Sequence, residues 1–165
     1  MKKIEEEEIL KKFPSTELGY EIGLKSYDFS LQRSDAVDNR IDRMLAWISG
    51  INLGTIAVFK ANEISFNSIY FTIAVALFLT ILVIGMIGKA RGTLTLIEPK
   101  KIFDSWLYYG KLYFKYQLLS YIGEHFEKNQ DFVNWKAKLL NWMIFLFLLE
   151  IIVLGIWIIF PNHYC

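Results

Sequence analysis

An uncharged stretch from Ser68 to Gly88 reads SIYFTIAVALFLTILVIGMIG. A helix rises about 1.5 Å per residue, so this stretch is long enough to cross a hydrocarbon core of about 30 Å. It predicts a transmembrane helix, because a run of this length without charge is typical of a membrane span rather than of a soluble core. The rest of the chain is interpreted outward from this segment.

Two further segments are apolar enough to accompany it. Residues 139–160, LLNWMIFLFLLEIIVLGIWIIF, have similar length but carry the carboxylate Glu150 near the middle. Residues 44–60, MLAWISGINLGTIAVFK, are shorter, and Lys60 can extend its charged end into the headgroup layer. The short connection to the Ser68 segment favours a transmembrane hairpin over a buried soluble helix.

These segments predict an all-α membrane protein with three transmembrane helices, at about 44–60, 68–88 and 139–160. Residues 1–15 are expected to form a charged leader without a cleaved signal, because charges stand where a signal needs an apolar centre. Residues 16–165 then form one helical membrane domain, with a cytoplasmic helix at 16–43, the hairpin at 44–88 and a cytoplasmic helical loop at 89–138.

The distribution of lysine and arginine predicts the orientation. Basic residues are frequent before Met44 and between Lys89 and Lys138, whereas the connection between the first two spans has only Lys60 at its edge. Three spans then place the N-terminus and the long loop in the cytoplasm and the C-terminus outside. Trp142 and Trp157 lie near the ends of the third span and are expected to be interfacial anchors.

The cytoplasmic segments are expected to pack on each other. One face of a helix that runs toward the first span carries residues at alternating spacings of four and three. They are the apolar Tyr20, Leu24, Tyr27 and Leu31, then the polar Ser34 and Asp38, and then Ile41 and Leu45. Pro14, Ser15 and Thr16 offer an N-cap for it. The aromatic loop at 102–135 is the expected partner in a small cytoplasmic bundle, and lying in the headgroup layer is the alternative.

Composition excludes several functions. The chain has 165 residues, 54% of them hydrophobic, and a net charge of +1, so it gives no electrostatic reason to expect a nucleic acid partner. It has one cysteine, which excludes an internal disulfide. No sequence pattern of a known catalytic or phosphate-binding site occurs, so we expect no enzyme activity, no cofactor and no metal.

Glu150 is the most informative residue, because an ionised carboxylate at the middle of a bilayer costs about 2.5 to 3.5 kcal/mol on insertion scales. Asn52 and Thr80 lie at similar depth in the other two spans and complete a candidate polar layer. This layer either lines a conduction path or holds helices together through a protonated Glu150. Both interpretations predict that Glu150 faces protein rather than lipid.

Ala46, Gly50 and Gly54 form a ladder of small residues four positions apart on the first span. Such a ladder lets another helix approach the backbone closely and predicts a packing face. The partner is the second span, the third span or a second copy of the chain.

The layout from YEIGLKSYDFSLQRSDAVDNRIDRMLAWISGIN, through an aromatic loop, to NWKAKLLNWMIF and a final span resembles the SLATT-type and Pycsar-type small transmembrane effectors of bacterial antiphage signalling. The resemblance implies a homo-oligomer in the bacterial inner membrane that perturbs or permeabilises the bilayer upon a signal of infection. No nucleotide-sensing domain is attached, so a separate cytoplasmic sensor or signalling protein is implied. A structural or accessory subunit, whose cytoplasmic helices dock a partner protein, is the alternative function.

The expected orientation is testable because Cys165 is the only thiol. A membrane-impermeant thiol reagent should label Cys165 in intact cells, since the C-terminus is expected outside. Labelling that requires permeabilisation would contradict the three-span topology.

Overall fold

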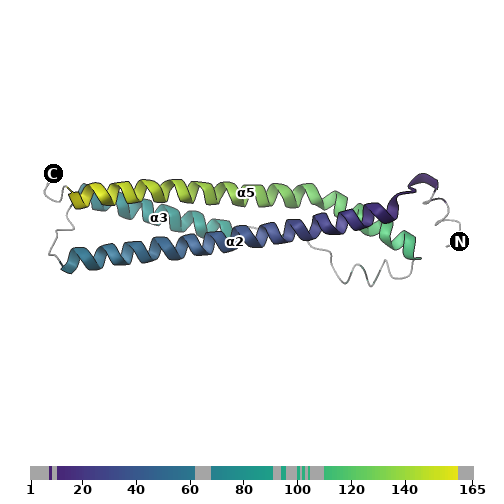
Figure 1. The fold of residues 1–165 in the computed structure, drawn as a ribbon, viewed down its shortest axis with the longest axis horizontal. Coiled ribbons are helices and arrows are strands. Elements are labelled where there is room, and N and C mark those ends of the chain that lie inside the picture. The colour runs from purple at the N-terminus through teal and green to yellow at the C-terminus, as the bar shows by residue number, and fades with distance from the viewer. Residues whose placement is uncertain are drawn as a thin grey trace. The chain divides into compact units, whose positions relative to one another are not determined.

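The computed structural model describes residues 8, 11–61, 68–90, 94–95, 100, 102, 104 and 110–159. Its long elements are three helices, α2 (Thr16–Ala61), α3 (Ile69–Ala90) and α5 (Lys111–Ile159) (Figure 1). Each is long and apolar enough to cross a membrane. The prediction of a helical chain with three such helices is therefore confirmed.

The helix boundaries differ from the predicted spans at two places. The 46 residues of α2 include both the polar helix and the first apolar segment, which continue without a break. The 49 residues of α5 include the second half of the long loop together with the third apolar segment, because no proline interrupts the chain between Lys111 and Ile159. Only α3 closely matches its predicted span. Most of the leader and residues 160–165, with Cys165, lie outside the described residues.

Helix α2 begins at Thr16, whose side chain stabilises the turn that precedes the helix. The Thr16 hydroxyl donates a hydrogen bond to the Phe13 carbonyl, at 2.7 Å. Sequence reasoning expected an N-cap here, in which a side-chain oxygen accepts a hydrogen bond from the first turn. The hydroxyl instead fixes the turn that precedes the helix.

The chain divides into two compact units, Met1–Ser34 with Thr93–Asn134, and Asp35–Gly92 with Trp135–Cys165. In the first unit, Leu118 and Ile122 of α5 are buried in a cluster with residues of the apolar stripe of α2; the partly buried members are Tyr20, Leu24, Tyr27, Ile102, Phe114 and Tyr121. The structure thus brings the stripe into contact with aromatic residues from the predicted partner segment.

Polar contacts add to this first unit. The Asn129 side chain accepts a hydrogen bond from the Thr95 backbone N–H at 2.8 Å and donates one to the Thr95 carbonyl at 3.2 Å. Glu17 pairs with Lys115, and the hydrogen bond and positive charge of Lys115 hold the pKa of Glu17 below its ordinary value of 4.5. A pKa below the ordinary value keeps the Glu17 carboxyl group ionised at neutral pH.

In the second unit, α2 and α5 run in the same direction with a constant offset. Asp38 pairs with Lys136 and Asn52 with Glu150, each across 98 residues of sequence, and Phe59 stacks on Trp157 at the same separation. Successive pairs are 14 and 7 residues apart along each helix, which are multiples of the seven-residue repeat of parallel packed helices. The repeat keeps the same face of each helix at the contact.

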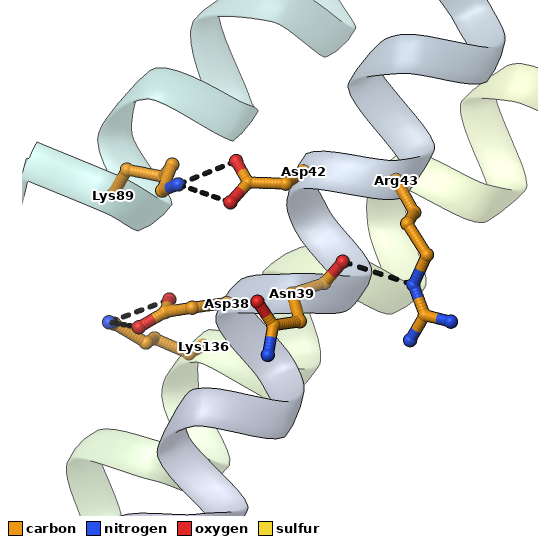
Figure 2. Close-up of polar contacts among 6 residues, drawn as sticks. All are labelled: Asp38, Asn39, Asp42, Arg43, Lys89 and Lys136. Carbon is orange, nitrogen blue, oxygen red and sulfur yellow. Dashed lines mark hydrogen bonds and ion pairs between the residues drawn. The ribbon is translucent and has the colours of Figure 1, made fainter.

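Ion pairs connect all three helices at one end of this unit (Figure 2). The buried Lys136 ammonium donates to both oxygens of Asp38 at 2.9 Å, which joins α5 to α2. Lys89 near the end of α3 pairs with Asp42 at 2.5 Å. The second pair is half exposed and contributes little to stability. Both pairs nevertheless fix which ends of the helices meet.

Helix α3 runs antiparallel to its two neighbours and packs through small residues. A Cβ added at Gly85 would lie 2.8 Å from Leu45 Cδ2 and 3.2 Å from Met143 Cε, and one at Gly88 would lie 3.3 Å from Ile41 Cδ1. These two glycines allow α3 to approach α2 and α5 closely. Gly85 and Gly88 were not part of the predicted ladder, because they are three positions apart and the ladder has small residues four positions apart.

The substitution Gly85→Leu is expected to destabilise the purified protein by about 1 to 3 kcal/mol, because the added side chain overlaps Leu45 and Met143. Gly155→Leu is the matched control, since Gly155 lies in the apolar part of α5 and a Cβ there meets nothing within 4 Å. Thermal unfolding in detergent measures both variants. Equal loss of stability in the two, or none at Gly85, would contradict this packing.

Candidate membrane polar site

Glu150 lies in the middle of the apolar part of α5, and its side chain is completely buried, with 0% exposure. It occupies the face of α5 that contacts α2, one step in the seven-residue repeat before Trp157. The carboxyl group is therefore turned toward protein.

Asn52 of α2 is its partner. The Asn52 amide donates one hydrogen bond to the Ile48 carbonyl at 2.9 Å and another to Glu150 Oε1 at 2.7 Å. Both amide protons are thereby used, and the orientation of the side chain is fixed by its own helix. Oε2 of Glu150 is buried and has no hydrogen-bond partner among the described residues. A neutral carboxyl accepting through Oε1 would carry its proton on Oε2.

Apolar side chains enclose this pair from both directions along the helices. One buried cluster lies on the side of the ion pairs and consists of Val37, Ile41, Ile48, Ile81, Leu140 and Met143. The other lies beyond the pair and consists of Phe59, Ala74, Leu154 and Trp157. The rings of Phe59 and Trp157 stack with centroids 3.7 Å apart and an angle of 7°. The Asn52–Glu150 pair is thus a polar contact between two apolar layers.

Thr80, the third predicted member of the polar layer, does not join the pair. Its hydroxyl donates to the Ala76 carbonyl in its own helix at 2.8 Å, and the residue is exposed. This bond satisfies the hydroxyl without a partner helix, which explains how Thr80 can face outward. The structure brings together two of the three residues.

The predicted ladder faces away from the other helices of the chain. Ala46, Gly50 and Gly54 are exposed, and a Cβ added at Gly50 or Gly54 would meet nothing within 4 Å. Of the three partners left open by the sequence, the second and third spans do not occupy this face in the described part of the chain.

Trp142 and Trp157 of α5, the two expected interfacial anchors, differ in their environment. Trp142 is 59% exposed, as an interfacial anchor would be. Trp157 is fully buried against Phe59 and Phe71, so its interpretation as an anchor is wrong. Its distance from the end of the apolar segment suggested an anchor, and the repeat shared with α2 places it in the core instead.

No cluster of three or more histidine, cysteine, aspartate or glutamate side chains that could hold a metal ion occurs among the described residues. The chain matches no protein-family model, no curated protein and no solved structure. The geometry of the Asn52–Glu150 pair therefore carries the functional argument.

The pair should be energetically coupled. In a double-mutant cycle of Asn52→Leu and Glu150→Leu, the double variant should be more stable than the sum of the single losses predicts, by on the order of 1 kcal/mol. The reason is that each single change leaves a buried polar group without its partner. Unfolding in detergent measures the cycle, and additive losses would contradict the hydrogen bond.

Proposed function

We propose that this chain is a membrane effector that oligomerises and perturbs or permeabilises the bacterial inner membrane in antiphage defence. The observation that carries the proposal is the buried pair of Asn52 and Glu150 between two helices that are apolar enough to span a bilayer. A carboxyl group at such a depth is costly and usually has a role in function or in helix association.

In the proposed arrangement, the apolar parts of α2, α3 and α5 cross the membrane. The positively charged flanks favour a cytoplasmic location for the N-terminus and for the segment between α3 and α5. The cluster around Leu118 and Ile122 then forms a small cytoplasmic bundle. This layout resembles that of the SLATT-type and Pycsar-type effectors, and it leaves the bundle available to a separate sensor.

Self-association uses the open face of α2 in the membrane. Gly50 and Gly54 leave the backbone uncovered there, and close approach of a second helix is the usual role of such residues in membranes. A second copy of the chain is the proposed occupant, because α3 and α5 pack elsewhere on α2.

In this proposal, the described arrangement corresponds to a closed state. Glu150 has no exposed surface, and apolar layers lie on both sides of its contact with Asn52. Permeabilisation therefore requires α2 and α5 to separate at this contact, which would turn Asn52 and Glu150 toward a water-filled path between copies. An ionised Glu150 on such a path would favour cations.

A second candidate function is that of a structural or accessory subunit. One observation favours it: Asn52 donates a hydrogen bond to Glu150 within a single chain. A buried Glu150 is then explained by helix packing alone, without an ion-conducting path. In that case the cytoplasmic helices dock a partner protein, and Glu150 only holds α2 against α5.

Membrane potential after induced expression separates the two functions. With phage challenge and the neighbouring genes present, the wild-type protein should depolarise the cell. Glu150→Gln should reduce this effect at equal protein level, because glutamine can still accept the Asn52 hydrogen bond but cannot ionise. Thr80→Val is the matched control and should depolarise like the wild type, since Thr80 lies outside the pair.

An accessory subunit predicts a different pattern. Glutamine would then replace Glu150 without effect, and only an apolar replacement would weaken assembly. A wild-type protein that never depolarises the cell under these conditions would contradict the effector function.

A further inference from the structure

A groove of about 400 Å³ lies on the outward face of α5, where the apolar segment begins. It is lined by Lys138, Asn141, Trp142 and Phe145. These residues are spaced three and four positions apart, so they share one face of the helix. Leu140 and Met143 are buried on the other side, in the core with α2 and α3. No side chain of another described helix lines the groove.

The groove has a polar end and an aromatic, apolar end. Lys138 and Asn141 supply an ammonium group and an amide at its polar end. Trp142 and Phe145 are 59% and 52% exposed, and their rings meet edge to face with centroids 5.9 Å apart. The groove therefore offers hydrogen-bond donors and a positive charge above an aromatic apolar surface.

Lys138 is available for an external anion. Its neighbour Lys136 is buried and bonded to Asp38, whereas Lys138 is exposed and has no ion-pair partner among the described residues. The positions three and four residues away on both sides carry asparagine or tryptophan, so no acid on α5 lies within pairing distance.

We infer that this groove binds an anionic glycerophospholipid, with the phosphate at Lys138 and Asn141 and an acyl chain along Trp142 and Phe145. A lipid fits because its charged and apolar parts follow the same order as those of the groove. The depth also fits, since Lys138 directly precedes the apolar segment that starts at Leu139. The inference rests on the membrane insertion in the proposed function, and not on the opening of a path.

Native mass spectrometry of the full chain in detergent tests the inference, with phosphatidylglycerol and phosphatidylcholine supplied at equal concentration. The wild type should favour phosphatidylglycerol by about fivefold, the ratio expected for one lysine near an anionic headgroup. Lys138→Gln should abolish this preference. Trp142→Leu should weaken the binding of both lipids while the preference remains.

Lys128→Gln is the matched control, because it removes the same charge from an exposed position on α5, about 15 Å along the helix from Lys138. It should retain the preference. An equal loss in both lysine variants would overturn the inference in favour of a general charge effect. Displacement of the bound lipid by excess glycerol phosphate would overturn it in favour of a free phosphate ligand.

The outcomes are distinguishable from those of the proposed function. Resistance of the wild-type protein to alkaline extraction from membranes reports insertion alone. If the inserted protein shows no preference for phosphatidylglycerol, the lipid site fails while the effector function stands. If the preference depends on Lys138 but the cells never depolarise, the lipid site stands and the effector function fails.

Discussion

The buried carboxyl group of Glu150 is the constraint on which the second unit, Asp35–Gly92 with Trp135–Cys165, depends. A carboxyl group among apolar side chains needs a hydrogen-bond partner, because water is not available to it. Asn52 is that partner, and its second amide proton is bound to its own helix at Ile48. The pair therefore specifies which residue of α2 lies opposite which residue of α5. Apolar packing alone would tolerate a shift of one helix along the other more readily.

Once this register is set, the other contacts between α2 and α5 follow from helix geometry. Two seven-residue steps toward the start of both helices lead to Asp38 and Lys136, and one step in the other direction leads to Phe59 and Trp157. The same face thus carries an ion pair, a neutral polar pair and an aromatic stack. Helix α3 fits against this frame because Gly85 and Gly88 remove the side chains that would keep it away.

Much of this frame is visible in the sequence of α2. The stripe from Tyr20 to Leu45 continues at the same spacing through Ile48, Asn52, Thr55 and Phe59, so the face that carries Asn52 could be predicted. The position of Glu150 was also predictable, because a charge in an apolar segment is conspicuous. Their common depth made contact between them a natural hypothesis.

Other features could not be predicted, because they depend on how one helix lies against another. The outward orientation of Thr80 depends on which face of α3 packs, and the hydroxyl can be satisfied by its own backbone. Gly50, Gly54 and Gly85 are all glycines in apolar helices, and the sequence does not distinguish their environments. Gly50 and Gly54 lie on an open surface, whereas Gly85 lies in close contact with other helices. Trp157 near the end of a span has the composition of an anchor, and only its alignment with Phe59 reveals a core residue.

The most direct test of this account is the distance between Asn52 and Glu150 in a lipid bilayer. Magic-angle-spinning NMR can measure dipolar dephasing between a ¹⁵N-labelled asparagine side chain and a ¹³C-labelled glutamate carboxyl in reconstituted protein. The account predicts strong dephasing, consistent with a hydrogen bond of 2.7 Å between Asn52 Nδ2 and Glu150 Oε1, and its loss in Asn52→Leu. Absence of this signal in the wild type, or an unchanged signal in Asn52→Leu, would contradict the account.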